Sequence, residues 1–299
     1  MCRSAPHLRS VARAPFLWFC LLGLLALQSG CASVLFFPEV GLERTPADLG
    51  LAYEEVAFNS LDGTRLHGWW LPAQGEVLGT VLFYHGNAQN IASHIGHVRW
   101  LPKAGYNVFL FDYRGYGKSS GVASLAGVHR DGRAALNFLR GRLRGDDFVV
   151  LGQSIGGAIA TYSLAAEGVA HVRAVALDSS FASYRQITCE KLGQMILTWP
   201  LKWPLSYLMP ERYSAGRGVG KIAPVPLLVI HGSADRTVPI RHGEQLFDLA
   251  GPPKTFLRVQ GGRHTSGLTM RDDQYRRYLL NFFGRALGHR PATWAVTDD

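Results

Sequence analysis

From about residue 50 onward the chain alternates short apolar runs with longer amphipathic stretches. The expected strands are 55–58, 65–71, 80–84, 107–111, 148–151, 172–177, 226–230 and 255–259, and the expected helices lie near 91–103, 124–142, 156–167, 240–250 and 270–287. Buried parallel strands read as unbroken apolar runs, and VLFY, VFLF, FVVL and PLLVI do so. The pattern therefore predicts an α/β fold with a mostly parallel central sheet and helices on both faces.

One insertion interrupts this alternation. Residues 181–222 separate two expected strands, and their LTWPLKWPLSYLMP stretch is too rich in proline and tryptophan for a plain helix. We expect a short lid here, with apolar side chains at Met195, Leu197, Trp199, Leu201, Trp203, Leu205, Tyr207 and Leu208. Two roles stay open for these side chains: they pack on the domain and close over its core, or they roof an acyl-binding pocket.

The first residues have the pattern of an export signal. Three arginines precede an apolar run of 12 residues at 16–27, which is short for a membrane span but typical of a signal peptide. Two small residues and then Cys31 follow this run. The arrangement resembles the bacterial lipoprotein signal, in which the cysteine is diacylated and becomes the mature N-terminus. An uncleaved signal anchor and ordinary secretion are the alternatives.

This resemblance implies a division of the chain and a location. We expect a signal peptide at 1–30, a tether at 31–49, the α/β domain at 50–288 and a C-terminal tail at 289–299. A lipid on Cys31 would make the membrane a partner of the protein. Because Ala32 rather than aspartate follows the cysteine, the expected location is the bacterial outer membrane, with the domain in the periplasm or outside.

Composition and charge narrow the classes of function. With 47% hydrophobic and 18% charged residues, the chain can bury a sizeable core. The net charge of +9 includes three arginines of the expected signal, and the remaining bases are dispersed, so nucleic-acid binding is not expected. Of the four cysteines only Cys189 belongs to the domain and carries no expected lipid, which excludes an intrachain disulfide there.

The segment GQSIGG at 152–157 carries the sharpest chemical signal. It follows the strand FVVL and opens the helical run AIATYSLAAEG. A serine on such a strand-to-helix turn has a strained backbone, so its neighbours two positions away must be tiny, as Gly152 and Gly156 are. The turn exposes the hydroxyl and directs the helix N-terminus at the reacting group. Ser154 is therefore the candidate nucleophile.

Three further motifs follow other expected strands. HGNA at 85–88 comes after VLFY, HGSADRTVP at 231–239 after PLLVI, and GGRH at 261–264 after TFLRV. Ser154, Asp235 and His264 stand in the chain order nucleophile, acid, base that a triad on this kind of sheet requires. Asp178 also follows a strand and is the rival acid, although the serines after it favour structural hydrogen bonds.

Together HGNAQN, DYRGYGKSSG, GQSIGG, HGSADRTVP and GGRH resemble the α/β-hydrolase superfamily, in its branch of small serine hydrolases, over roughly residues 50–287. The resemblance implies hydrolysis of carboxylic esters or related acyl compounds, with a small acyl ester as substrate and no cofactor or metal. It implies that His264 is the base and Asp235 the acid that orients it. The backbone N–H groups of Asn87 and Ile155 would form the oxyanion hole, with Ala88 as the alternative to Asn87.

Other interpretations involve histidines and other protein classes. His85 precedes a glycine in its motif and favours a structural hydrogen bond. His94 and His97 are three residues apart and read as a surface pair rather than a metal site. A serine peptidase or amidase of the same fold, and a non-catalytic scaffold of the cell envelope, are the alternative functions.

Overall fold

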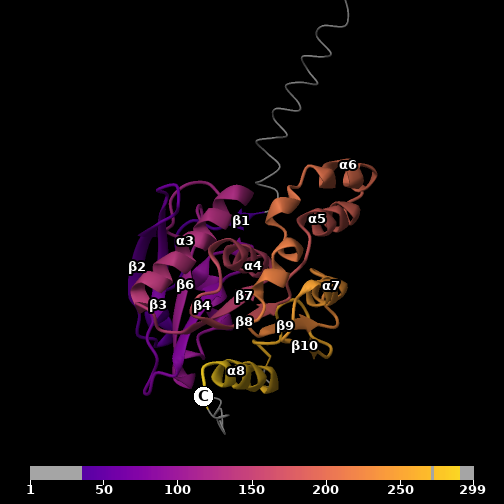
Figure 1. The fold of residues 1–299 in the computed structure, drawn as a ribbon. Coiled ribbons are helices and arrows are strands. Elements are labelled where there is room, and N and C mark those ends of the chain that lie inside the picture. Colours follow the sequence, from indigo (N-terminus) through magenta and orange to yellow (C-terminus); the bar gives the residue numbers. More distant parts are fainter. Residues whose placement is uncertain (1–35, 271–272, 290–299) are drawn as a thin grey trace, which may run out of the picture.

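The computed structural model describes residues 36–270 and 273–289 (Figure 1). The expected signal peptide, Cys31 and residues 290–299 of the expected tail lie outside this part of the chain. Within the described ranges, no helix combines the length and the apolar character that a membrane span needs.

An eight-stranded sheet forms the centre of the molecule, in the order β10-β9-β8-β7-β4-β6-β3-β2. The strands are β2 Glu54–Asn59, β3 Arg65–Leu71, β4 Gly79–Tyr84, β6 Tyr106–Phe111, β7 Phe148–Gln153, β8 Val172–Asp178, β9 Leu227–Gly232 and β10 Lys254–Val259. The six neighbouring strands β10, β9, β8, β7, β4 and β6 run parallel, and β3 pairs antiparallel with both β6 and β2. The mostly parallel sheet is thereby confirmed, with every expected strand present.

Helices cover both faces of this sheet, because alternate residues of the buried strands point to opposite sides. Leu82 and Tyr84 of β4 belong to one core, and Val81 and Phe83 to the other. The first core lies under α3 and α4, and the second under α2 and α8. The α-helices are α2 Ile91–His94, α3 Leu125–Leu143, α4 Ile155–Glu167, α5 Tyr184–Gly193, α6 Lys202–Tyr207, α7 Arg241–Leu249 and α8 Gln274–Ala286.

The helix expected at 91–103 is divided into shorter pieces. After α2 come the 3-10 turns η3 Ile95–His97 and η4 Pro102–Ala104. Proline lacks an N–H and favours the first position of such a turn, which explains why η4 begins at Pro102. The other 3-10 turns are η2 Pro46–Leu49, η5 Trp199–Leu201, η6 Glu211–Tyr213, η7 Ala215–Arg217 and η8 Val219–Ile222.

The described part of the expected tether, from Phe36 onward, is packed on the domain. Phe36 is buried, and the short strand β1 Phe37–Pro38 pairs in parallel with β5 Ala88–Gln89. The side chain of Asn90 donates to the carbonyl oxygens of Glu39 and Gly41, at 3.2 and 2.7 Å. The domain therefore begins earlier than residue 50, and the polar Asn90 gave no sequence signal of these contacts.

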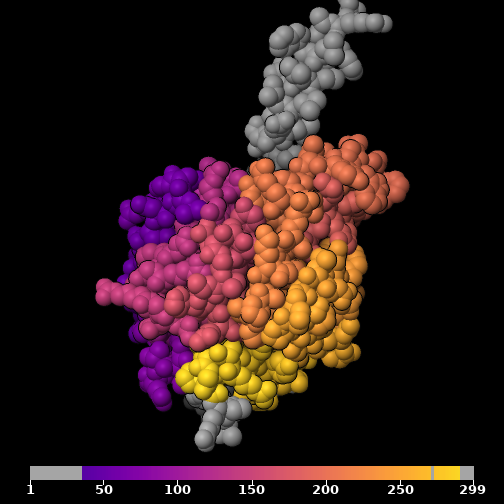
Figure 2. All heavy atoms as spheres, in the orientation of Figure 1, coloured from indigo at the N-terminus to yellow at the C-terminus, as the bar shows by residue number. Residues whose placement is uncertain are grey.

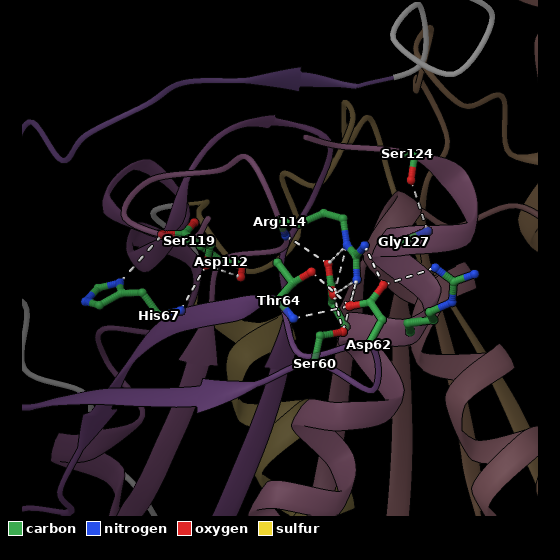
Figure 3. A network of polar contacts seen from close by, with 11 residues as sticks. Ser60, Asp62, Thr64, His67, Asp112, Arg114, Ser119, Ser124 and Gly127 are labelled. Carbon is green, nitrogen blue, oxygen red and sulfur yellow. Dashed lines mark hydrogen bonds and ion pairs between the residues drawn. The ribbon is translucent and has the colours of Figure 1, made fainter. Parts of the chain in front are cut away.

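A buried ion pair fixes the loop that follows β6. Arg114 in this loop donates to Asp131 of α3 at 2.7 Å and to Asp62 of the β2–β3 turn at 2.9 Å. Ser60 donates to the same Asp131 carboxylate at 2.6 Å. Figure 3 shows Arg114, in the loop after β6, beside Ser60 and Asp62 of the β2–β3 turn. The network ties the loop to both the sheet edge and α3.

Removal of Asp131 should be among the more destabilising single changes. Its carboxylate is fully buried, and Asp131→Ala leaves Arg114 with Asp62 as its remaining carboxylate partner, so the change should lower the free energy of unfolding by about 3 kcal/mol. Asp147→Ala is the matched control, because its ion pair with Arg173 is solvent-exposed and should contribute at most about 1 kcal/mol. Urea denaturation measures the free energy of unfolding of both variants. Equal losses would mean that the buried ion pair stabilises the fold no more than the exposed one.

Candidate active site

Ser154 lies at the turn between β7 and α4 in a strained conformation. Its φ of 53° and ψ of −122° are rare for a residue with a side chain. A Cβ on Gly156 would collide with the carbonyl oxygen of Tyr84, and one on Gly152 would lie 2.6 Å from the Cα of Gly157. The crowding shows why small residues flank the serine, as the sequence indicates.

The structure brings the three expected triad residues together. His264, after β10, places Nε2 at 3.1 Å from Ser154 Oγ. Its Nδ1 lies 2.7 Å from Oδ2 of Asp235, which follows β9. The short contact with a carboxylate places the proton of a neutral imidazole on Nδ1, which leaves Nε2 free to accept from the serine hydroxyl.

Asp235 is held as a carboxylate. Its Oδ1 accepts the backbone N–H groups of Thr237 and Val238, both at 2.8 Å. Burial alone would raise the pKa of this carboxyl, but hydrogen bonds with His231 and His264 outweigh burial and lower the pKa below its usual value. A charged acid therefore faces the imidazole at neutral pH.

Asp178, the rival acid, occupies a different position. Its buried side chain accepts from Ser179 Oγ at 3.0 Å, and its carbonyl oxygen accepts the N–H of Ser154 at 2.8 Å. Ser179 Oγ also accepts the N–H of Thr265, beside His264, at 3.0 Å. Burial raises the pKa of Asp178 to about 6. Asp178 and Ser179 thus support the backbone around the triad, whereas the imidazole bonds to Asp235.

The HGNA turn after β4 has its peptide planes fixed by side chains. Four successive carbonyl oxygens each have a side-chain partner at 3.2 Å or less: His85 O with Tyr113, Gly86 O with His85, Asn87 O with Tyr116 and Ala88 O with His94. Because a trans peptide directs its N–H opposite to its C=O, these contacts also set the directions of the N–H groups. The turn is preorganised, and the structural role expected for His85 is confirmed.

The N–H groups of Asn87 and Ile155 are available for a ligand. Both residues line the same cavity as Ser154. Among the hydrogen bonds of residues 36–270 and 273–289, neither of these two N–H groups has an acceptor. Ser154 and these two donors therefore border one space, as the sequence suggests.

The interpretation of His94 and His97 as a surface pair is wrong. His94 lines the cavity, and its ring contacts the Gln153 side-chain amide at 2.8 Å and the Ala88 carbonyl at 2.9 Å. Both partners present oxygens, Oε1 of Gln153 and the carbonyl oxygen of Ala88. Burial lowers the pKa of His94, and a neutral ring donates to one of these two oxygens at a time. His94 links the serine turn to the HGNA turn. In the described part of the chain, no three His, Cys, Asp or Glu side chains could hold a metal ion.

An apolar cavity of about 610 Å³ opens at Ser154. Its apolar wall consists mainly of Phe37, Ile155, Phe181, Tyr184, Ile187, Leu192, Met195 and Val238. Helix α5, which contributes Tyr184, Ile187 and Leu192, is held on the body by the contact of Glu190 with His242 at 2.9 Å. This helix forms the roof.

The tryptophan-rich part of the insertion has neither of the two roles expected for it. Trp199 and Trp203 are 58% and 61% exposed and are not among the described residues that line the cavity. They lie on η5 and α6, beyond the end of α5, so they neither pack on the core nor roof the pocket. Met195 is the only residue of the expected apolar set that reaches the cavity wall.

Comparisons with known proteins agree with this architecture. The family model described as alpha/beta hydrolase fold matches residues 79–206. The uncharacterized protein YfhR of Escherichia coli is 40% identical over 242 residues, which cover 78% of this chain and 81% of YfhR. The alpha/beta hydrolase domain-containing protein WAV2 of Arabidopsis thaliana is 34% identical, over 87% of this chain and 88% of WAV2. The chain belongs to the alpha/beta hydrolase fold family.

Solved structures of esterases share the fold. The Pyrococcus furiosus esterase Pf2001 superposes with a TM-score of 0.67 at 22% identity, covering 85% of this chain and all of that one. The esterase domain of a Rhodothermus marinus protein gives a TM-score of 0.55 at 24% identity, with 80% and 97% covered.

Proposed function

We propose that the protein is a serine hydrolase that cleaves carboxylic esters through an acyl-enzyme intermediate. The observation that carries the proposal is the continuous set of contacts from Ser154 through His264 to the charged Asp235, at the floor of an apolar cavity. The similar Pyrococcus and Rhodothermus structures are both esterases, which supports the ester class.

The geometry supports a two-step reaction. His264 Nε2 takes the Ser154 proton as Oγ attacks the acyl carbonyl, and the N–H groups of Asn87 and Ile155 receive the oxyanion. Collapse of this intermediate breaks the bond to the alcohol oxygen, which leaves with the proton from His264. A water molecule then repeats the attack on the acyl-enzyme with the same base, and it releases the carboxylic acid and free Ser154.

The apolar wall of the cavity sets an expectation for the acyl group. Each methylene that enters the cavity contributes up to about 0.8 kcal/mol, so kcat/KM for p-nitrophenyl esters should rise about fourfold per carbon until the cavity is full. A panel from acetate to dodecanoate measures the series. A profile that is flat from acetate to octanoate would contradict acyl binding in this cavity.

One change in the roof should alter the profile. Leu192→Ala enlarges the cavity and should change kcat/KM more for esters longer than butyrate than for the acetate ester. Leu257→Ala is the control, because Leu257 packs beside the core on β10 and is not among the described cavity residues. Equal effects of Leu192→Ala on acetate and octanoate would place the acyl chain elsewhere.

For location, we propose that a lipid on Cys31 anchors the protein in the cell envelope. The support is the sequence signal alone: the apolar run at 16–27 and the small residues before Cys31. A palmitate analogue supplied to a bacterial host should label the wild-type protein and leave Cys31→Ser unlabelled.

A further inference from the structure

The segment that follows α5 forms an exposed apolar ridge, here called the cap ridge and defined as residues 195–208. Ile196 and Leu197 are 92% and 89% exposed, far more than isolated surface side chains require. The other large exposed apolar residues of the ridge are Met195, Trp199, Leu201, Trp203, Tyr207 and Leu208. Soluble proteins rarely leave so contiguous an apolar surface without a partner.

The charges of the cap ridge narrow the choice of partner. From Lys191 to Met209 the chain has two lysines and no acidic residue. The ammonium of Lys202 lies 5.7 Å from the ring centroids of both Trp199 and Trp203. Indoles and lysines together are typical of surfaces that lie at the headgroup level of a bilayer with anionic lipid. A second copy docked ridge to ridge would instead bring like charges together.

The cap ridge is continuous with the mouth of the cavity. Met195 belongs to both, since it is 57% exposed and lines the cavity wall. Phe37 also lines the cavity and is 62% exposed. Helices α5 and α6 lie at the same end of the molecule as β1 (Figure 1), and the cap projects from the body there (Figure 2).

The described part of the chain begins at the same end of the molecule. Phe36 stands five residues after Cys31 and nine after Leu27, the last residue of the apolar run. At about 3.6 Å per residue, these segments span at most roughly 18 and 32 Å. Whether a lipid or the apolar run enters the membrane, the first described residues, and the cavity mouth beside them, must stay near its surface.

We propose that the cap ridge docks on the headgroup and upper acyl region of an anionic bilayer, so that the cavity opens toward the lipid. Trp199 and Trp203 enter the interface, and Lys202 remains among the phosphates. If the proposed ester hydrolysis is correct, the substrates are esters of amphiphiles resident in the membrane, which enter past Met195.

The test uses the full chain in vesicles of phosphatidylglycerol and phosphatidylethanolamine, with and without brominated acyl chains that quench nearby indoles. Trp199→Phe/Trp203→Phe removes the ridge indoles, and Trp70→Phe/Trp100→Phe is the control pair. In a chain that keeps Trp18 of the apolar run, we expect the quenchable tryptophan emission to fall about threefold in the ridge variant. After signal cleavage, which removes Trp18, it should fall to nearly zero. In the control variant it should stay unchanged.

Three results would overturn docking on lipid. The first is equal quenching in the ridge and control variants. The second is quenching that neither Lys202→Glu nor high salt changes. The third is a dimer that forms without lipid and already shields the ridge indoles from water. Hydrolysis of soluble p-nitrophenyl butyrate by the wild type, measured in the same preparations, reports the proposed function separately. An active enzyme whose ridge is not quenched would contradict docking alone, and an inactive protein whose ridge is quenched would contradict the function alone.

Discussion

Replacing Ser154 by alanine should lower kcat/KM for p-nitrophenyl butyrate by about three orders of magnitude or more, and His264→Ala should have a similar effect. Ser154 Oγ is the only hydroxyl described in contact with His264 Nε2, at 3.1 Å. Without the hydroxyl no acyl-enzyme forms, and without the imidazole no group takes its proton. Initial rates over a substrate series measure the loss.

The double variant shows whether Ser154 and His264 act in the same catalytic step or independently. Members of a triad act as a unit, so Ser154→Ala/His264→Ala should be little worse than either single change. His171→Ala is the control, because His171 is exposed and its side chain pairs with the surface residue Asp147. Losses that multiply in the double variant would show that the two residues do not serve one step.

Asp235→Asn should lower kcat by about four orders of magnitude with little change in KM. The amide can donate to His264 Nδ1, which favours the tautomer with its proton on Nε2, and that ring cannot accept from Ser154. Asp178→Asn is the matched control: it changes the other buried acid near the site and should cost far less activity. The reverse order of severity would move the catalytic acid to Asp178.

The same two variants differ in how their stability depends on pH. Burial raises the folded-state pKa of Asp178 to about 6, so the folded protein holds more protons there than the unfolded chain between about pH 4 and 6. Its contribution to stability therefore falls as pH rises through that window. Asp178→Asn should be more stable relative to the wild type at pH 8 than at pH 4, as urea midpoints would show.

The contribution of Asp235 to stability depends on pH in the opposite direction. Its folded-state pKa is lowered, because hydrogen bonds from two histidines outweigh burial. Its stabilisation is present above the unfolded pKa of a carboxyl and is lost as pH falls through the folded value. Asp235→Asn should therefore be less stable than the wild type at pH 8, by a margin that narrows in acid.

The strands and the serine turn could be predicted from the sequence because each depends on local pattern. Apolar runs such as FVVL leave a strand no exposed face, and the crowding at Gly152 and Gly156 is caused by residues adjacent in the chain or in the neighbouring strand. The chain order of Ser154, Asp235 and His264 then identified three residues that the fold brings together.

Other features depend on contacts that no local pattern reveals. His94 has the spacing of a surface residue, yet it bonds to Gln153, 59 residues away. Asn90, the last residue of HGNAQN, bonds to the segment that follows the buried Phe36, and the motif itself does not reveal these contacts. The sequence predicts that the apolar side chains at 195–208 pack on the domain or roof the pocket, but α5 lines the cavity instead, and most of the stretch is exposed.

The central claim is that Ser154 is a serine activated by its neighbours. A fluorophosphonate probe tests it most directly, because an activated serine attacks phosphorus and expels fluoride at neutral pH, whereas ordinary serines do not. We predict rapid labelling of the wild type on a peptide that contains Ser154, much slower labelling of His264→Ala, and none of Ser154→Ala. Equal labelling of the wild type and Ser154→Ala would contradict the account.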